Sequence, residues 1–433
     1  MTFMIHKILY KCFERYKNPS LDSYYKFLLE SDFWSLEKLE EYQFLKCRDF
    51  LSFAYTYSDY YRDLFDECRF SPASMTSLQD LKNIPVLEKS TLLRLNGKIQ
   101  SKYPFKKLFL SETSGSTGQP MRFYRNEEWV SQHRASIFRG HSWYGLERWD
   151  RNGLFWGYNL ARNKRWKIRI LDYFQNSYRF FSYKEEDLLH FIRHLGKASY
   201  LQGYSSMIYE VAKMVNRGEM KKDFSLKMVK GTSEKIYDSY KSEVNTAFGQ
   251  KLISEYGAAE AGIIAFECPC GSMHINMESV IVEEENGEII VTNLLSKSFP
   301  IIRYKLGDSV ILADAKYKCP CGRQHPVLLD VVGRVGSIIY GREHKYPSLT
   351  LYYVFKNLLL KFNICLNYQG VQYQKGSLEL RLEQSDTGYE PVLRDELKKY
   401  FADDLDIKIL YSQSIHTYKG KLRDFVSKVN IKE

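Results

Sequence analysis

The sequence predicts an α/β protein in which a large N-terminal α/β region is followed by a small α+β C-terminal domain. Strand-like and helix-like segments alternate through the middle of the chain, hairpin patterns begin near residue 275, and a separate set of helices and strands follows. A chain of 433 residues can bury more than one core. We therefore expect a helical N-terminal part of the large domain over 1–100, a binding core over 101–333 and a small mobile domain over 334–433.

The first 100 residues are expected to be mainly helical. Apolar residues recur at spacings of three and four from Ser35 to Phe65. The start of the chain is amphipathic and is interrupted by His6 and Lys7, so it reads as a first helix and not as a signal peptide. No run of about 18 apolar residues suggests a membrane span. We expect a cytoplasmic protein, for which peripheral membrane contact stays open.

The middle of the chain predicts a parallel sheet with a ligand site at one edge. Three strand-like segments between 199 and 260 each end in a polar, glycine-containing loop, and helical segments separate them. The loops at Gly203, Gly231 and Gly257 would gather at the carboxyl edge, where open parallel sheets bind ligands. The side chains expected near this crevice are Tyr204, Glu234, Tyr256 and Glu260.

Two hairpins and a final α+β segment are expected after the sheet. The first hairpin would turn at Asn286-Gly287 and the second, "FPIIRYKLGDSVIL", at Gly307-Asp308. Beyond the boundary near "GRVGS", "PSLTLYYVFKNLLLKF" and "EPVLRDELKKYF" read as helices. "SLELRLEQ" and "DIKILYS" read as strands.

A doubled cysteine pattern predicts a metal site. The motif "CPCG" occurs at Cys268/Cys270 and again at Cys319/Cys321. Thiolate pairs brought together from separate hairpins suit a tetrahedral structural zinc, which would clamp the loop after "YGAAEAG" to the later hairpin. The alternative is reduced cysteines in turns, since disulfides are unexpected in the cytoplasm. Four ligands are expected: Cys319, Cys321 and Cys268, with Cys270 and His274 competing for the fourth place.

A polar loop, "SETSGSTGQP" over 111–120, raises the question of an anion site. It lacks the lysine and the four-residue glycine spacing of a Walker loop, and no helix follows it as in a dinucleotide-binding loop. Four hydroxyls and two glycines over 113–118 could still form an anion nest. From these residues alone, a flexible surface connection is the favoured interpretation.

The charge of the chain favours anionic partners. Lys and Arg total 63 and Asp and Glu total 52, so the formal net charge is +11. Nucleotides, polyphosphates, acidic glycans or a membrane surface would suit this charge. The densest basic cluster runs from Arg162 to Arg169 and contains an aromatic residue, as nucleic-acid sites do. Because no nucleic-acid module is recognisable, we interpret it as a solvated basic face and expect no nucleic-acid partner.

Six motifs in order carry a family resemblance. "TSGSTGQP", "GTSE", "YGAAE", "RYKLGD", "GRVGS" and "GKLRDF" together resemble the adenylate-forming superfamily of acyl- and aryl-CoA ligases. Within it the chain is similar to the phenylacetate–CoA ligase branch, and especially to its capsule-biosynthesis (CapK-like) relatives. "LSFAYTYSDYYRDLF" and "LKNIPVLEKSTL" extend this resemblance to the N-terminal part.

The resemblance implies an ATP-dependent, AMP-forming ligase. A carboxylate would attack the α-phosphate of ATP and give an acyl-adenylate and pyrophosphate, with Mg assisting. Negative charge builds on the phosphates, so donors and cations placed there do most of the work. The acyl group would pass to CoA or, in a capsule-type relative, to an amine or hydroxyl of a glycan. The second outcome would place the protein in capsule or surface polysaccharide biosynthesis.

The same resemblance implies roles for individual residues. Tyr256, with Gly257 beside it, would stack on adenine, and Glu234 would line that pocket. Asp308 would accept hydrogen bonds from the ribose hydroxyls, and Arg334 would meet ribose or phosphate. The loop that would hold the β- and γ-phosphates consists of Thr113, Ser114, Gly115, Ser116, Thr117 and Gly118.

The catalytic residues implied are Lys421, Glu260 and Thr117. Lys421 would reach the α-phosphate and carboxylate oxygens from the small domain, and Glu260 would bind Mg. Each residue taken alone has a plainer interpretation: Lys421 as a surface lysine, Glu260 as an acid in the first turn of a helix, and Asp308 as a turn residue.

Two departures from the family pattern remain. Gly336 and Ser337 stand where the family usually has an acidic pair, one of which serves as the hinge of the small domain. Glycine is a permissive hinge, but its geometry differs. Met121 follows Pro120 where many relatives carry lysine. The phenylacetate branch also tends to lack this lysine, so the departure fits the resemblance to that branch. The missing acidic hinge and the basic cluster motivate an alternative function, a catalytically silent nucleotide- or polyanion-binding protein with the same fold.

Overall fold

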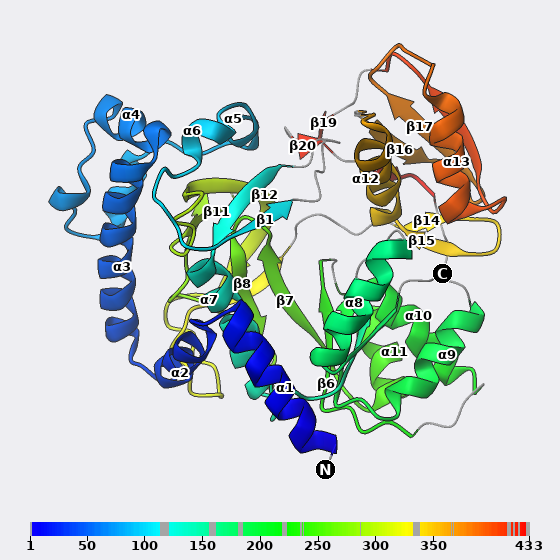
Figure 1. Ribbon diagram of the computed structural model, residues 1–433, viewed down its shortest axis with the longest axis horizontal. Helices are drawn as coiled ribbons and strands as arrows, with labels where there is room; N and C mark the ends of the chain where they lie inside the picture. Colours follow the sequence, from blue (N-terminus) through cyan, green and yellow to red (C-terminus); the bar gives the residue numbers. More distant parts are fainter. Residues whose placement is uncertain are drawn as a thin grey trace. The chain divides into compact units, whose positions relative to one another are not determined.

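The computed structural model divides into two compact units (Figure 1). One comprises Met1–Ser111 with Phe123–Arg334, and the other comprises Glu112–Arg122 with Val335–Glu433. The structure describes residues 2–112, 121–155, 162–180, 185–218, 223–233, 236, 238–285, 287–331, 338–364, 366, 368–413, 417–418, 421–422 and 425–429.

Helices occupy most of the first 100 residues, as predicted. The longest of them, α3, begins where the Ser35 hydroxyl accepts a hydrogen bond from the Lys38 amide at 3.3 Å. Its buried face includes Leu39, Cys47 and Leu51, which follow helical spacing. The helices are α1 (Thr2–Lys17), α2 (Leu21–Ser31), α3 (Leu36–Tyr57), α4 (Asp59–Glu67), η1 (Pro72–Ser74), η2 (Leu78–Asn83), α5 (Lys89–Arg94) and α6 (Asn96–Ile99).

The described residues of the first unit form an 11-stranded sheet with the order β10-β11-β12-β13-β9-β8-β7-β6-β5-β3-β4. Strands β4, β3, β5, β6 and β7 pair in parallel, which confirms the predicted parallel sheet. From β7 onward the pairing is antiparallel. The strands are β3 (Asn152–Phe155), β4 (Ser177–Phe180), β5 (Tyr200–Tyr204), β6 (Met228–Thr232), β7 (Leu252–Ala258), β8 (Gly262–Glu267), β9 (Met273–Ile275), β10 (Val280–Glu285), β11 (Glu288–Asn293), β12 (Ile301–Leu312) and β13 (Val327–Val331).

Helices cover this sheet and complete the unit. α10 packs against β5 and β6, α11 packs against β7, and α7 packs against β8. Gly140 allows α7 to approach β8 closely. A Cβ at this position would lie only 2.5 Å from the Phe266 ring. None of the helices in the described part of the chain combines the length and the apolar content needed to cross a membrane. The remaining elements are β1 (Leu108–Glu112), β2 (Arg122–Asn126), α7 (Glu127–Ser142), α8 (Arg162–Phe174), α9 (Glu185–Leu195), α10 (Ser205–Asn216) and α11 (Asp238–Phe248).

The predicted second hairpin is wrong. The segment "FPIIRYKLGDSVIL" contributes one continuous strand, β12, which pairs with β11 and then with β13. Gly307 has a φ of +80°, and the register with β11 shifts around it, from Lys305 opposite Ile290 to Ser309 opposite Glu288. Glycine at this position therefore forms a bulge inside a strand, where the sequence suggested a turn.

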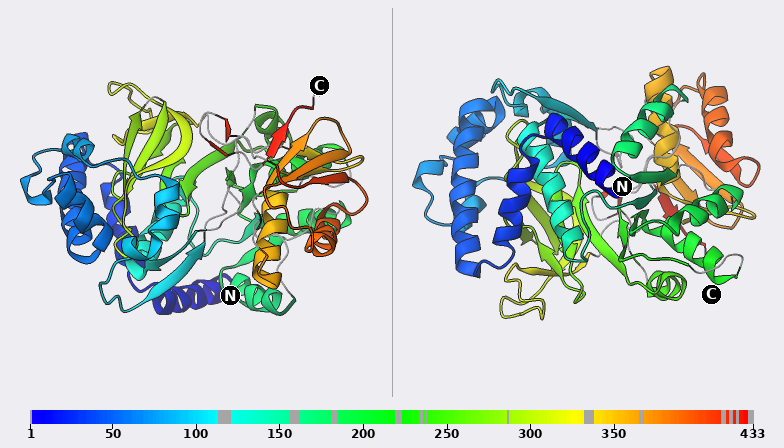
Figure 2. Two further views of the ribbon diagram at one scale, coloured as in Figure 1. Left: turned by 90° about the horizontal axis from the view of Figure 1, so that it is seen from above. Right: turned by 60° about the horizontal axis from the view of Figure 1, so that its bottom comes forward.

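The second unit contains a four-stranded sheet with the order β18-β17-β16-β21. Its helices α12 (Leu349–Phe362) and α13 (Glu390–Phe401) lie side by side (Figure 2), and both were predicted. Strands β17 (Ser377–Leu382) and β18 (Asp406–Leu410) were also predicted. The other strands are β14 (Ile338–Tyr340), β15 (Lys345–Pro347), β16 (Tyr368–Gln372), β19 (Thr417–Tyr418), β20 (Lys421–Leu422) and β21 (Phe425–Ser427).

Candidate functional site

Three glycines shape the carboxyl edge of the parallel strands. A Cβ on Gly203 would lie 2.4 Å from the carbonyl oxygen of Phe155, and a Cβ on Gly231 would lie 2.4 Å from the Ser205 hydroxyl. A Cβ on Gly257 would lie 2.4 Å from the carbonyl oxygen of its neighbour across the turn, Gly262. A larger residue would displace neighbouring backbone at Gly203 and Gly257, and it would displace the Ser205 side chain at Gly231. The predicted loops therefore leave the sheet at one edge, with Gly203 directly opposite Gly231.

Two of the predicted nucleotide-site residues meet at this edge. The Tyr256 hydroxyl, from β7, donates a hydrogen bond of 2.9 Å to the Asp308 carboxylate, from β12. The bulge at Gly307 immediately precedes Asp308, so the irregularity in β12 lies next to the residue that makes the contact. This hydrogen bond joins two residues that are 52 positions apart in the chain.

Glu260 lies in the turn between β7 and β8, not in the first turn of a helix. Its main-chain carbonyl accepts a hydrogen bond of 2.9 Å from the Asn293 side chain. Arg125, on β2, is close enough for its charge to interact with Glu260. Burial lowers the pKa of the Arg125 guanidinium to about 10, and Glu260 acts in the opposite direction. Arg125 was not predicted as a site residue, although the alternating strand "MRFYR" gave a weak signal of inward placement.

A buried ion pair supports the same edge. The Lys230 ammonium, on β6, lies 2.6 Å from the Glu255 carboxylate, on β7, and both side chains are less than a tenth exposed. Lys230 directly precedes Gly231, and Glu255 directly precedes Tyr256. The pair therefore links the two strands at the point where their loops begin. This ion pair was not predicted, although a lone lysine within an apolar strand is an informative signal.

Several predicted site residues cannot be compared with the structure. Lys421 begins the short strand β20, in which it pairs with Tyr418, and only its backbone placement is described. The residues that lie outside the described ones are Thr113, Ser114, Gly115, Ser116, Thr117, Gly118, Glu234, Arg334, Gly336 and Ser337.

A second group of functional side chains forms around the doubled cysteine pattern. The possible ligand atoms of Cys268, His274, Cys319 and Cys321 all lie within 4.8 Å of one another. We call these four residues the Cys3His cluster. Cys270 is exposed and is not part of it, so His274 holds the fourth place that the sequence left open between them.

The geometry of the Cys3His cluster fits zinc. The sulfurs of Cys268 and Cys319 are 3.6 Å apart, and tetrahedral bonds of about 2.3 Å would hold two sulfurs about 3.8 Å apart. His274 places its Nδ1 3.1 Å from the carbonyl oxygen of His325, which leaves Nε2, 3.2 Å from the Cys321 sulfur, to face a metal. Burial lowers the pKa of His274 to about 4, so its ring is neutral at pH 7, as ligation requires.

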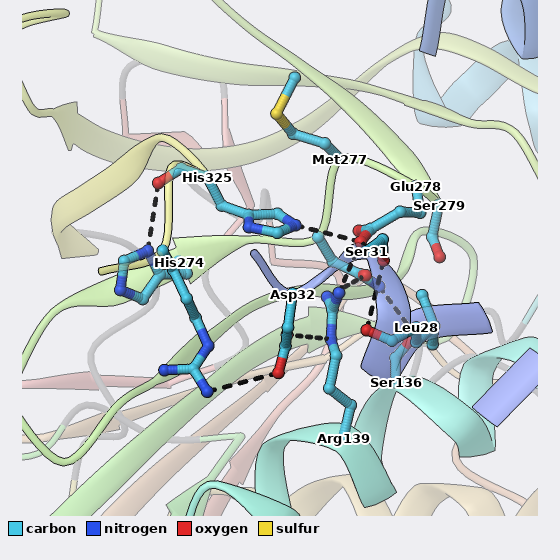
Figure 3. A network of polar contacts seen from close by, with 12 residues as sticks. Leu28, Ser31, Asp32, Ser136, Arg139, His274, Met277, Glu278, Ser279 and His325 are labelled. Atoms are coloured by element: carbon cyan, nitrogen blue, oxygen red, sulfur yellow. Dashed lines mark hydrogen bonds and ion pairs between the residues drawn. The ribbon is translucent and has the colours of Figure 1, made fainter. Parts of the chain in front are cut away.

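A buried polar network lies directly beside this cluster (Figure 3). The His325 ring contacts the Glu278 carboxylate at 3.0 Å, and Arg139, from α7, contacts the same carboxylate at 2.6 Å. Asp32, which follows α2, lies 3.6 Å from Arg139 and 3.3 Å from Arg323. Two residues of the segment that supplies the last two cysteines therefore belong to this network: Arg323 contacts Asp32, and His325 contacts Glu278, which also binds Arg139 on α7.

Charge keeps the central carboxylate of this network ionised. Burial would raise the pKa of Glu278, but Arg139 and His325 outweigh it and hold the pKa well below its ordinary range. The Ser31 hydroxyl donates a further hydrogen bond to the same oxygen. A carboxylate with this many donors is a strong anchor between helices and sheet.

Comparison with solved structures identifies the class to which this fold belongs. A 2-hydroxyisobutyryl-CoA ligase in complex with 2-HIB-AMP and CoA, in its thioesterification state, superposes with a TM-score of 0.64, at 16% identity over 92% of this chain and 91% of that chain. The same ligase in its postadenylation state, in complex with R3-HIB-AMP, gives a TM-score of 0.61 at 16% identity over the same shares. The protein thus has the fold of the adenylate-forming CoA ligases, including the smaller C-terminal domain, and the predicted fold class is confirmed.

Comparison with curated sequences gives one particular relative. The chain is 25% identical to "Protein CapK" of Staphylococcus aureus over 329 residues, which are 70% of each protein. This similarity agrees with the CapK-like resemblance of the motifs. No family model matches the chain.

Proposed function

We propose that this protein is an ATP-dependent, AMP-forming ligase that activates a carboxylic acid as an acyl-adenylate and transfers the acyl group to an acceptor. The observation that carries the proposal is the contact between Tyr256 and Asp308 at the carboxyl edge of the sheet. Ligands of open parallel sheets bind at this edge, and both residues are ones that the motifs assign to the nucleotide. The ligase fold, matched over most of the chain, supports the same reaction.

The described residues suggest how ATP would be oriented. Asp308 would accept hydrogen bonds from the ribose hydroxyls while the Tyr256 hydroxyl holds the carboxylate in place. The Tyr256 ring would then lie against adenine. Glu260 would hold Mg, which screens the phosphates, and the nearby Arg125 would add a positive charge.

The remaining roles rest on the motifs alone. The loop over 113–118 would bind the β- and γ-phosphates through its hydroxyls and amides, with Thr117 closest to the reaction. Glu234 would line the adenine pocket, and Arg334 would meet ribose or phosphate. Lys421 would stabilise charge on the α-phosphate and on the attacking carboxylate.

The acceptor is proposed more broadly. CoA is the acceptor that the fold supports, since the similar ligase structures contain it. The similarity to CapK favours a glycan amine or hydroxyl and a role in capsule or surface polysaccharide biosynthesis. Either reaction needs ATP, so we place the protein in the cytoplasm.

A pyrophosphate-exchange assay tests the first half-reaction. Purified protein with Mg, ATP and a panel of carboxylic acids is expected to exchange labelled pyrophosphate into ATP with at least one acid, and Lys421→Ala should abolish this exchange. Addition of CoA or a glycan acceptor to the active acid then identifies the second half-reaction. No exchange with any acid, together with unchanged ATP binding in Lys421→Ala, would instead favour the catalytically silent nucleotide-binding protein.

We also propose that the Cys3His cluster binds a structural zinc. Four protein ligands complete a tetrahedral site and leave no position for a substrate, which is the arrangement of structural zinc. Metal analysis of protein purified without chelators is expected to give about one equivalent of zinc. Less than about 0.2 equivalents would contradict the proposal, because structural zinc binds tightly.

A further inference from the structure

Helices α1 and α8 both belong to the first unit (Figure 1). They contact one another, and the rings of Phe13 and Phe174 stack between them with centroids 5.7 Å apart. The two helices are far apart in the sequence. Their outward faces can therefore act together as one surface, which we call the α1–α8 face.

Large apolar side chains are exposed on this face. On α8, Trp166, Ile170 and Tyr173 are 57%, 43% and 60% exposed, and their spacing of four and three places them on one stripe of the helix. On α1, Ile8 is 59% exposed and Tyr16 is 84% exposed. An apolar stripe on two adjoining helices is unusual for a surface that meets only water.

The charges of the α1–α8 face have one sign. Each helix contains a single acid, and both acids are buried in ion pairs: Glu14 with Arg134, and Asp172 with Arg179 at 2.9 Å. The charged side chains that the structure describes as exposed on these helices are all basic: Lys11, Arg15, Lys167 and Arg169. On the described parts of these two helices, the exposed charges beside the apolar stripe are therefore all positive.

We propose that the α1–α8 face binds the surface of an anionic lipid bilayer. Amphipathic helices with basic flanks lie in the interfacial plane, with their apolar side chains among the upper acyl chains. Tryptophan and tyrosine are the aromatic residues that favour this depth, and lysine and arginine bind anionic headgroups. The binding is peripheral and does not depend on the ligase function.

Two other partners fit the same face less well. Nucleic acid would pair its phosphates with the cations, but the aliphatic side chains of Ile8 and Ile170 would gain little from it. A second copy of the chain would bury the apolar stripe, but like charges would then face one another across the twofold axis. Of these three partners, the lipid interface is the one that uses the apolar and the basic residues together.

Vesicle co-sedimentation of the full-length protein tests the proposal. We expect binding to vesicles of phosphatidylcholine mixed with phosphatidylglycerol, little binding to phosphatidylcholine alone, and weakening as salt increases. Each basic residue near such a surface contributes about fivefold to affinity, so Lys167→Glu/Arg169→Glu should weaken binding at least about twentyfold. Trp166→Ser/Ile170→Ser should also weaken it, but with an unchanged dependence on salt.

Matched variants at exposed positions elsewhere serve as controls. Lys375→Glu/Lys408→Glu makes the same change in charge, and Ile311→Ser/Phe362→Ser removes similar apolar area. Both should bind vesicles as the unmodified protein does, and circular dichroism should show that all four variants are folded.

Three results would overturn the proposal. The first is absence of binding to the anionic vesicles. The second is equal loss of binding in the α8 variants and in the controls. The third is that the α8 variants change only binding to a single-stranded oligonucleotide, or only self-association, and leave vesicle binding intact.

Discussion

The hydroxyl of Tyr256 connects the residue proposed to contact adenine with the residue proposed to contact ribose. It donates to Asp308, a residue that needs a fixed orientation to accept two neighbouring hydroxyls. Tyr256→Phe keeps the ring and loses this donor, whereas Asp308→Ala removes the acceptor itself. The two substitutions therefore separate orientation from direct binding.

We expect Tyr256→Phe to raise the KM for ATP about fivefold, which corresponds to the free energy of one hydrogen bond. Asp308→Ala should raise this KM at least about thirtyfold, because it removes a charged acceptor. The measurement is pyrophosphate exchange at varied ATP with the active acid held constant. A KM for ATP that is the same in Asp308→Ala as in the unmodified protein would show that the carboxylate does not bind the nucleotide.

Lys230 and Glu255 give a second prediction for single residues. Their pair is buried, so Lys230→Met should lower the free energy of unfolding by about 3–5 kcal/mol because it leaves a carboxylate without its cation. Adding Glu255→Gln should recover part of this loss, because the uncompensated charge is then removed. Urea unfolding of both variants checks the expectation, and a double variant less stable than Lys230→Met would contradict it.

Single elements show where sequence reasoning succeeds and where it fails. The parallel strands β5, β6 and β7 were predictable because apolar runs and glycine-containing ends recur at regular intervals. Strand β12 was misread because Gly307-Asp308 has the composition of a hairpin turn, and pairing with β13, some twenty residues later, decides that the chain continues. The local amino-acid composition does not indicate this long-range strand pairing.

In the candidate site, too, local motifs could be recognised from the sequence and long-range contacts could not. Tyr256, Asp308 and the four residues of the Cys3His cluster could be singled out from the sequence because each lies in a motif with its own spacing, and their binding roles stay predictions. Arg125 and the pair of Lys230 with Glu255 were not predicted, because their partners come from strands that the sequence does not show to be neighbours. The choice of His274 over Cys270 likewise depended on β9 pairing with β13, which brings Val327 opposite His274.

The Cys3His cluster gives a prediction at the scale of elements. Cys319→Ser should lower the bound zinc to well below one equivalent and lower the Tm, because the remaining three ligands no longer close the site. Cys270→Ser is the matched control, since that thiol is exposed outside the cluster and should change neither quantity. Equal loss of zinc in both variants would contradict the ligand set.

The network beside the cluster should show a characteristic dependence on pH. Glu278 has a pKa below its ordinary value, so its contribution to stability is complete above about pH 5 and is lost as the pH falls below about 4. Glu278→Gln should cost about 3–5 kcal/mol at pH 7, because the buried Arg139 guanidinium loses its anion. Urea unfolding should show this difference shrinking toward acidic pH, and a difference that grows there would be contrary to the assignment.

Across the whole molecule, buried histidines predict a loss of stability in mild acid. Burial lowers the pKa of His133 to about 3, with Arg125, Arg134 and Lys230 acting in the same direction. Burial also lowers the pKa of His141 well below its ordinary value. In the unfolded chain both rings take up protons near pH 6.5, so acid favours the unfolded state from that pH downward.

Each of these two rings should remove up to about 2 kcal/mol between pH 6.5 and pH 5. The urea midpoint should fall steadily as the pH is lowered over this range. His141→Asn should reduce the dependence of the midpoint on pH, even if the substitution lowers stability at every pH. A midpoint that is constant from pH 6.5 to pH 5 would mean that both rings are protonated in the folded protein.

The short segment from Cys319 to His325 contains two proposed zinc ligands and two partners of the helical network. With zinc bound, this segment would be fixed beside Cys268 and His274, and its Arg323 and His325 would then hold Asp32 and Glu278 in place. Packing of the first helices would therefore depend on the supply of zinc. Cells starved of zinc should accumulate chains whose first helices are open to proteases, well before any catalytic residue is touched.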